Sequence, residues 1–420
     1  MNFKKRLAPN LYFTCALLLA LLSGYLGWPV LISSAEVASQ IFIRLLKLVS
    51  LPIIFLSIVS TISGMESLTE IKNLGKKVIK YTLLTTIIAA TVALGLFVLI
   101  QPVRTVLSSE TPLQEGPQGS YLTYLIEAIP SNIIQPFSDN NVLGVLFLAL
   151  LLSLAILVLP AQNRSTLHTF FSSLYAAVMK MTTWLVRLMP LAIWAFVTLF
   201  FQEFKNGLEY QSLALYLACV VGANIIQATL VLPLLLKLNG LSPWKVAKGM
   251  FPALSVAFFT KSSAAALPMA MRCAEENVHV SRKVASFTLP LCTTINMNGC
   301  AAFILTTVLF VSISNGMVFA PFEMVLWIFI ATIAAVGNAG VPMGCYFLAS
   351  AFLAAMNVPL NLLGVILPFY AMIDMLESAI NVWSDSCVTV IVHKQTINSE
   401  ANLSTTIPLT DTPAGMIESS

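Results

Sequence analysis

The sequence predicts an all-α polytopic membrane protein, on the evidence of its composition and of the length of its apolar segments. Hydrophobic residues occupy 58% of the 420 positions, against about 45–50% in soluble domains. Charged residues occupy only 10%, against about 25%, which is too few to cover a soluble surface. The apolar residues fall in runs of about 20, the length of a helix that crosses a bilayer. Soluble, disordered and fibrous classes are therefore excluded.

The first half of the chain predicts ordinary membrane-spanning helices. The first predicted helix follows the basic residues 4–6, as the apolar part of a signal peptide does. Because its apolar stretch is long enough to cross a bilayer, we expect it to be kept as a transmembrane helix and not cleaved. The polar, proline-containing segment 104–139 predicts an external loop, and residues 395–420, which lack apolar periodicity, predict a mobile cytoplasmic tail. The six predicted helices are 11–32, 41–63, 78–103, 140–160, 170–202 and 211–237.

Two later segments are hydrophobic but interrupted at their centres. Residues 245–275 are broken by a polar run at 260–263, and residues 322–356 are broken by a glycine- and proline-containing run at 337–342. Their apolar arms of about 10–14 residues suit re-entrant segments better than crossings, although two kinked helices are an alternative. Each is followed by a long helix. The sequence thus predicts eight transmembrane helices plus two re-entrant helical hairpins, in the inverted repeats typical of transporters. The two long helices are 282–314 and 360–393.

Basic residues gather at alternate ends of the predicted helices. Clusters lie before the first helix, between the second and third, and at 237–248 and 272–283, whereas 32–40 has no lysine or arginine. By the positive-inside rule, both termini are cytoplasmic. We expect the protein to lie in the plasma (inner) membrane. Only the hairpin arrangement keeps Arg282 and Lys283 inside. Because the clusters recur at membrane-span intervals, we expect no nucleic-acid partner.

The cysteines and histidines do not predict catalysis. The seven cysteines show no zinc spacing, and nearly all lie in apolar segments, where cysteine packs as a small hydrophobic side chain. The three histidines lie at segment ends, without a catalytic triad or an H-E-x-x-H pattern. We therefore expect a protein that is not an enzyme and has no organic cofactor.

Polar residues form one stripe on the last helix. They occur at i, i+3, i+4, i+7 and i+11, which is one face of a helix. Three of these residues are acids, Asp374, Glu377 and Asp385. A charge near the bilayer centre costs about 2.5–3.5 kcal/mol, so the three acids must face a polar interior. Only Lys261 is a plausible deep partner, so a structural ion-pair network does not account for all three acids. The stripe consists of Asp374, Glu377, Ser378, Asn381 and Asp385.

The preceding helix supplies oxygen donors that suit a small hard cation. Hydroxyl, amide and freed carbonyl oxygens, with a carboxylate, are ligands of such ions. Hairpin N–H groups suit a carboxylate, and Asp374 suits an ammonium. The pattern therefore predicts an amino acid carried with a cation, with Na⁺ and H⁺ both open. The donors are Thr293, Thr294, Asn296 and Asn298.

Several motifs resemble the dicarboxylate/amino acid:cation symporters, the sodium-coupled glutamate transporter family. They run in order from about residue 10 to 394. The motifs are Leu45–Phe55, Asn141–Val145, the serine-containing run Thr260–Pro268, Ser286–Leu291, Asn296-Met297-Asn298-Gly299, Gly340-Val341-Pro342, and Asp374-Met375 followed by Asn381-Val382 and Asp385.

The resemblance implies a homotrimer of glutamate-transporter-like fold with two parts in each subunit. Scaffold helices 1–2 would lie in 1–77 and scaffold helices 4–5 in 140–210. The moving transport domain would consist of helix 3 at 78–103 and of residues 211–394, which hold helix 6, hairpin 1, helix 7, hairpin 2 and helix 8.

The resemblance also implies roles for individual residues. Asp374 matches the position that binds the substrate ammonium, and Asn381 the one that binds its α-carboxylate. Ser263 and Val341 match hairpin-tip positions whose backbone binds substrate. Three sodium sites are implied. The first matches Asn296, Asn381 and Asp385. The second matches Thr294 together with the backbone of the second hairpin tip around Ala335, Val336 and Asn338. The third matches Thr85, Thr86, Asn296 and Asn298.

Two departures from the family pattern limit these implications. The family's Asn-Met-Asp is Asn-Met-Asn here, so the third sodium site loses its carboxylate at Asn298. Glu377 stands where members that carry acidic substrates have an arginine, and a glutamate repels a substrate carboxylate. We therefore expect a neutral or cationic amino acid. Glu377 then either receives a cationic side chain or pairs with Lys261, which the family geometry places nearby. The alternatives are a proton-coupled or acidic amino acid/dicarboxylate symporter, or a channel-like anion conductance.

Overall fold

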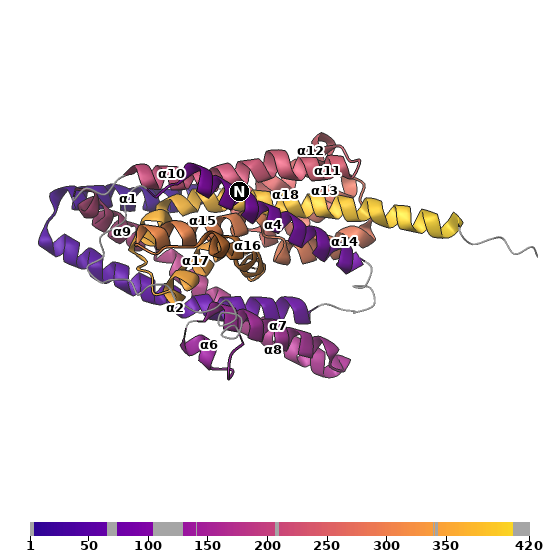
Figure 1. Ribbon diagram of the computed structural model, residues 1–420, viewed down its shortest axis with the longest axis horizontal. Helices are drawn as coiled ribbons and strands as arrows, with labels where there is room; N and C mark the ends of the chain where they lie inside the picture. The colour runs from indigo at the N-terminus through magenta and orange to yellow at the C-terminus, as the bar shows by residue number, and fades with distance from the viewer. Residues whose placement is uncertain are drawn as a thin grey trace, which may run out of the picture.

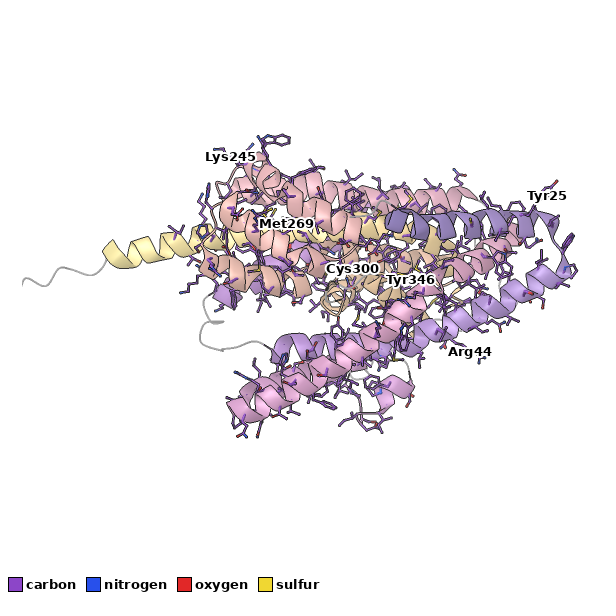
Figure 2. The ribbon with its side chains drawn as sticks, turned by 180° about the vertical axis from the view of Figure 1, so that it is seen from behind. Tyr25, Arg44, Lys245, Met269, Cys300 and Tyr346 are labelled. Atoms are coloured by element: carbon purple, nitrogen blue, oxygen red, sulfur yellow. A yellow bond between two sulfur atoms is a disulfide. The ribbon has the colours of Figure 1, made fainter. Side chains whose placement is uncertain are left out.

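The computed structural model describes residues 4–64, 74–103, 129–139, 141–205, 210–338, 340 and 343–405, and the regular secondary structure in these ranges is helical. Most helices run as long rods along one direction (Figure 1). Seen from behind, Cys300 and Tyr346 lie near the middle of the long axis and Tyr25 lies at one end (Figure 2). The predicted all-α architecture is confirmed for the described residues.

One group of helices packs around α2. Helix α2 contacts α7, α8 and α9, and α1 lies along α9, where Trp194 Nε1 donates to Ser23 Oγ at 3.0 Å. The boundary between α1 and α2 lies inside the predicted helix 11–32, because Gly27 has a φ of +63° and Pro29 opens α2. The bounds are α1 Lys4–Leu26, α2 Pro29–Ser63, α6 Gln135–Ser138, α7 Val142–Val158, α8 Ala161–Arg187 and α9 Met189–Lys205.

The predicted single helix 170–202 is wrong. Helices α8 and α9 meet there at an angle of 52°. Pro190 is the second residue of α9; it has no N–H to donate to the preceding turn and its ring crowds that turn. The helix therefore bends instead of continuing.

A second group surrounds α15. Helix α15 contacts α4, α10, α16, α17 and α18, and large aromatic side chains fill the spaces between them. Tyr216 stacks on Phe310 with ring centroids 4.5 Å apart, and Phe303 lies 4.6 Å from Tyr370. The bounds are α4 Lys76–Ile100, α10 Tyr210–Ile226, the π-helical segment η2 Gln227–Val231, α11 Leu232–Leu238, α14 Arg282–Ile295, α15 Asn298–Ser314 and α18 Asn361–Thr405.

Two helical hairpins lie in this second group. In hairpin 1, α12 (Pro243–Thr260) ends at Lys261, whose φ is +55°, and Ser262 then caps α13 (Ser263–Glu276) by accepting from Ala265 N at 3.2 Å. Its arms return to the same end, where Asn277 Nδ2 donates to Gly249 O at 2.8 Å.

Hairpin 2 consists of α16 (Pro321–Val336) and α17 (Gly344–Ala355). Trp327 of α16 contacts Phe352 of α17 edge-on, with ring centroids 5.3 Å apart. Hairpin 1 lies just before the N-terminus of α14, and hairpin 2 lies just after the C-terminus of α15. The open ends of the two hairpins therefore lie at opposite ends of the α14–α15 segment.

Four helical segments among the described residues are long and apolar enough to cross a membrane. The bent pair α8 and α9 is a fifth if it counts as one span. The number of eight transmembrane helices with two re-entrant hairpins stays a prediction. The four segments are Lys76–Ile100, Gln211–Leu238, Arg282–Ser314 and Asn361–Ile397.

The predicted mobile tail is wrong for residues 395–405, because α18 continues to Thr405. No glycine or proline interrupts this stretch. Its start is also anchored: Lys394 Nζ donates to Asn239 O at 2.8 Å, and Lys77 Nζ donates to Gln395 O at 3.2 Å. Residues 406–420 and most of the predicted external loop lie outside the described residues.

Candidate functional site

The two hairpin tips meet in the middle of the second group. Ser262 Oγ of hairpin 1 donates to Gly340 O of hairpin 2 at 3.3 Å. Gly340 has a φ of +68°, and a Cβ there would lie 2.9 Å from Thr293 O of α14. Glycine is therefore required at this tip for both its conformation and its close approach to α14.

The break between α14 and α15 brings the start of α15 against α18. Asn296 and Met297 leave the helical conformation, and Gly299 N then donates to Asn381 Oδ1 of α18 at 2.9 Å. A Cβ at Gly299 would lie 2.9 Å from Glu377 Cα. Backbone polar groups of a broken helix thus lie beside the polar stripe of α18.

A small cavity lies at this meeting point. Its volume is about 10 Å³, about enough for one water molecule. It brings together all the predicted substrate residues except Val341, which lies outside the described residues. The lining residues are Ser263, Cys300, Asn338, Gly340, Cys345, Asp374, Glu377, Ser378 and Asn381.

Two buried carboxylates share one tyrosine in the cavity wall. Asp374 is 4% exposed and Glu377 is 1% exposed. Tyr370 OH lies 3.4 Å from Asp374 Oδ1 and 3.3 Å from Glu377 Oε2, and Met343 N donates to Asp374 Oδ2 at 3.4 Å. Glu377 Oε1 is buried without a hydrogen-bond partner. A buried carboxylate beside another needs a cation or a proton.

Lys261 is the candidate cation for Glu377. Its ammonium interacts electrostatically with Asp374, and the ion pair found among the described residues is the surface pair Arg272–Glu276. The alternative in which Lys261 pairs with Glu377 is thus not represented by an ion pair among the described residues, and it stays a prediction.

A cluster of oxygen atoms surrounds Asp385, three turns further along α18. Asn296 Nδ2 donates to Asp385 Oδ1 at 3.0 Å and to Ser384 Oγ at 2.9 Å. Asp385 is 1% exposed, and its Oδ2 has no hydrogen-bond partner. An orphaned carboxylate oxygen fits a small hard cation such as Na⁺. The Oδ1 atom of Asn381 is already engaged by Gly299 N, so a further ligand must share it.

The predicted third sodium site is filled by amide hydrogen bonds. Asn298 Nδ2 donates to Asn296 Oδ1 at 2.8 Å and to Ser384 Oγ at 2.9 Å, and lies 3.4 Å from Thr85 Oγ1. Gln227 Nε2 donates to Asn298 Oδ1 at 2.6 Å. Three predicted residues thus come together, whereas Thr86 Oγ1 donates to Thr82 O of its own helix at 2.8 Å.

Among the described residues, no hydrogen bond joins Thr294 to the second hairpin tip, whose own Asn338 N donates to Ala335 O at 3.1 Å. Thr294 Oγ1 donates to Leu291 O at 2.7 Å, within its own helix. Asn338 Nδ2 points towards sulfur atoms, 2.8 Å from Cys300 Sγ and 3.6 Å from Cys345 Sγ. Asn338 Oδ1 is buried without a partner.

Cys300 and Cys345 are joined by a disulfide, with their Cα atoms 5.3 Å apart. The prediction that nearly all cysteines pack as small hydrophobic side chains therefore does not describe this pair. The error arises because the two cysteines are 45 residues apart in the chain, and only the packing of α17 on α15 brings them together.

Sequence reasoning also missed Tyr370 and Gln227. Tyr370 lies four residues before Asp374 and seven before Glu377, so it continues the polar stripe of α18 and was recognisable by its spacing. Gln227 opens the π-helical segment η2, a distortion that is frequent at functional sites but has no sequence signal here.

Comparison with known proteins gives relatives over most of the chain. It is 26% identical over 394 residues to the neutral amino acid transporter B(0) of Bos taurus, covering 85% of this chain and 73% of the relative. It is 27% identical over 398 residues to the human neutral amino acid transporter A, covering 84% and 74%. It is 27% identical over 409 residues to the mouse excitatory amino acid transporter 3, covering 84% and 78%.

The family profile covers nearly the whole chain. The sodium:dicarboxylate symporter family matches residues 11–395, which include both hairpins, the broken helix and the polar stripe of α18. The chain belongs to this sodium:dicarboxylate symporter family of integral membrane transporters.

Proposed function

We propose that this protein is a secondary active symporter that couples inward flow of Na⁺ to uptake of an amino acid by alternating access. One observation carries the proposal: a single face of α18 presents two different sites. The acids Asp374 and Glu377 line a cavity between the hairpin tips, and the oxygen cluster at Asp385 lies eleven residues beyond Asp374, about 16 Å along the helix. One site suits an organic ammonium and the other a small metal cation.

The ends of an amino acid match the ends of the cavity. Asp374 would bind the ammonium, replacing its long contacts to Tyr370 and Met343. The α-carboxylate would lie against Asn381 Nδ2 and the N-terminus of α13 at Ser263, whose free N–H groups favour an anion. Ser378 lies one turn before Asn381 on α18, on the same wall. By resemblance, the backbone of Val341 would complete this end.

The side-chain end of the substrate would face Glu377. An acidic side chain would be repelled there, which supports a neutral substrate, and two of the relatives are named as neutral amino acid transporters. A cationic side chain is the second candidate, because Glu377 Oε1 is buried without a partner. A neutral substrate leaves Glu377 to carry a proton or to accept a substrate N–H or O–H.

For the coupling ion we favour the site of Asp385, Asn296 and Asn381. Asp385 contributes a full negative charge and an orphaned oxygen, and proton coupling is the alternative because buried carboxylates also relay protons. Thr294 with the hairpin-2 backbone near Asn338 is a second proposed site, which needs a rotation of the Thr294 hydroxyl away from Leu291 O.

The packing supports a division of the subunit into a fixed part and a moving part. We propose that α1, α2 and α7 to α9 form the scaffold of a homotrimer, and that α4 and α10 to α18 form the transport domain. Contacts within each group are more extensive than those between them, which run mainly through α17 on α2 and α18 on α9. We place the protein in the plasma membrane with the basic end of the bundle, near Lys77 and Lys394, in the cytoplasm.

Reconstituted vesicles test this function. The protein in liposomes with an inward sodium gradient would be given a panel of labelled serine, alanine, lysine, arginine and glutamate. We expect concentrative, sodium-dependent uptake of serine or alanine, and a channel would show no accumulation against a gradient. Full accumulation without sodium at fixed pH would overturn the choice of ion, and preferred uptake of glutamate would overturn the substrate class.

A further inference from the structure

We propose that Cys300 and Cys345 form a thiol–disulfide site in the wall of the substrate cavity, and that its redox state controls how far α17 can separate from α15. The proposal rests on the proposed function, since it describes regulation of the same cavity. It differs from the function in its chemistry, which needs neither sodium nor an amino acid.

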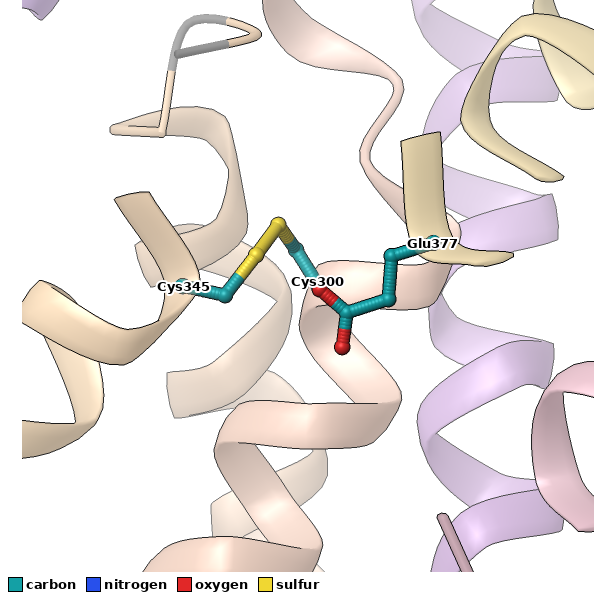
Figure 3. Close-up of side chains that lie close together, drawn as sticks. All are labelled: Cys300, Cys345 and Glu377. Carbon is teal, nitrogen blue, oxygen red and sulfur yellow. A yellow bond between two sulfur atoms is a disulfide. The ribbon is translucent and has the colours of Figure 1, made fainter. Parts of the chain in front are cut away.

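The position of the pair within the cavity is the first argument. Cys300 lies in the first turn of α15 and is fully buried, and Cys345 lies in the first turn of α17 and is 2% exposed. Both line the cavity together with Glu377, and Figure 3 shows the Glu377 side chain reaching towards the two cysteines. A small molecule that enters the substrate cavity therefore comes within reach of the sulfur atoms.

The size of the cavity is the second argument. At about 10 Å³ it holds about one water molecule, so an amino acid enters only if the elements around it separate. The hydrogen bonds across the boundary are long: Ser262 Oγ to Gly340 O is 3.3 Å and Met343 N to Asp374 Oδ2 is 3.4 Å. Such contacts break readily, whereas a covalent bond does not.

The disulfide lies where it would restrain this opening. Cys345 comes two residues after Met343, whose N–H contacts Asp374, and Cys300 comes one residue after Gly299, whose N–H is capped by Asn381. The bond therefore ties the start of α17 to the start of α15 beside both poles of the proposed substrate site. In the oxidised protein the bond ties the start of α17 to the start of α15, so the cavity opens only partly, through tip contacts such as Ser262 Oγ to Gly340 O that the bond does not span, and small molecules enter slowly. In the reduced protein α17 withdraws further and entry is faster.

The chemistry is thiol–disulfide exchange with a small dithiol. A thiolate of the dithiol attacks one sulfur of the disulfide and forms a mixed disulfide, and the other cysteine leaves as a thiolate that takes up a proton. The second thiol of the reagent then displaces the remaining cysteine. The dithiol loses two electrons and two protons and becomes a cyclic disulfide, while both cysteines become thiols. A small-molecule disulfide reverses the reaction.

The test uses the full protein in liposomes with a sodium gradient and labelled serine. Dithiothreitol treatment, followed by its removal, is expected to raise the initial rate at least about tenfold. A small linear disulfide, bis(2-hydroxyethyl) disulfide, is expected to reverse this by accepting the two electrons of the cysteine thiols and leaving as two molecules of thiol. The Cys300→Ser, Cys345→Ser double variant is expected to be fast in both conditions. Cys219→Ser, a buried free cysteine of α10, is the matched control and is expected to respond as the wild type does.

Two readouts that do not involve transport separate this proposal from the proposed function. Peptide mass spectrometry reports the 300–345 cross-link, and hydrogen exchange reports the amides of α17, which are expected to exchange faster after reduction. A cross-link and faster exchange without uptake in any state would uphold the redox site and overturn the symporter. Sodium-driven uptake that ignores reduction, or the absence of the cross-link under oxidising conditions, would overturn the redox site alone.

Discussion

Gln227 Nε2 donates to Asn298 Oδ1 at 2.6 Å, and both side chains are buried. This contact orients the Asn298 amide so that its nitrogen faces Asn296 Oδ1, Ser384 Oγ and Thr85 Oγ1. Three oxygen atoms around one point could supply part of a cation site, and here the uncharged N–H₂ group of Asn298 lies among them. The amide network therefore satisfies these oxygens without a bound ion.

Replacing Asn298 by Asp should recreate a demand for a cation. The new carboxylate would oppose Asn296 Oδ1, now 2.8 Å away, so acceptors would face one another until a cation lies between them. We expect tighter sodium binding and a steeper sodium dependence of uptake. An additional sodium ion would contribute about 2.3 kcal/mol of driving force per 100 mV.

The sodium dependence of uptake in liposomes measures this change. Asn163→Asp, on the exposed start of α8, adds the same charge away from the site and serves as the control. An Asn298→Asp protein with an unchanged Hill slope would contradict the idea that the amide network fills a vacated ion site.

Much of the site was predictable because helical spacing is a local property. The stripe from Asp374 to Asp385 follows directly from a 3.6-residue period, and α18 presents it to the interior as expected. The broken segments were equally visible, because glycine, proline and serine interrupt apolar runs at positions where the tips meet.

The remainder of the site depends on packing between distant segments. The Cys300–Cys345 bond depends on how closely α17 approaches α15. Whether Lys261 pairs with Glu377 depends on the tertiary placement of the Lys261 side chain, which follows α12 in a left-handed backbone conformation. The bend at Pro190 was missed because the apolar run continues through it. No local pattern encodes the disulfide or the placement of Lys261, whereas the proline at 190 is itself a local signal for a bend.

Asp385→Asn should weaken sodium binding strongly while leaving the fold intact. The substitution keeps the size of the side chain and its acceptor for Asn296 Nδ2, but it removes the charge and the orphaned oxygen that fit the cation. We expect the sodium concentration for half-maximal uptake to rise at least about tenfold, which corresponds to about 1.4 kcal/mol. Thermal unfolding in detergent, compared with the wild type, checks that the protein stays folded. Unaltered sodium affinity would show that the ion binds elsewhere.

Asp374→Ala should abolish amino acid binding. It removes the anion proposed to hold the substrate ammonium in a site with little water, and breaking a buried pair costs about 3–5 kcal/mol, or more than about 100-fold in affinity. Direct serine binding by calorimetry at saturating sodium measures the loss. Glu276→Ala removes an exposed carboxylate of the surface pair with Arg272 and should bind as the wild type does. Equal affinity in both variants would make Asp374 a purely structural residue.

Tyr370→Phe should expose the cost of placing two acids together. The tyrosine O–H contacts both Asp374 and Glu377, and its loss leaves a buried carboxylate with fewer donors, a penalty of about 1–3 kcal/mol. We expect a lower thermal midpoint in the absence of substrate. Substrate should recover part of the difference, because its ammonium would stabilise Asp374. Tyr175→Phe, in α8 and outside the cavity, is the control, and an identical midpoint for the two variants would argue against a stabilising role of Tyr370.

Glu377→Arg should turn the cavity towards acidic amino acids. Asp374 would still bind the ammonium, and an arginine at 377 would offer a planar pair of donors to a substrate carboxylate. Glu377 packs against Gly299, so the longer side chain extends into the space between the tips. Binding of serine, alanine, lysine, arginine and glutamate would be measured for wild type, Glu377→Arg and the surface control Glu276→Arg. We expect glutamate to bind only the Glu377→Arg protein. Any affinity of lysine and arginine for the wild type should be lost in Glu377→Arg. Tight glutamate binding by the wild type would mean that another base performs the role of the arginine and that Glu377 does not set the substrate class.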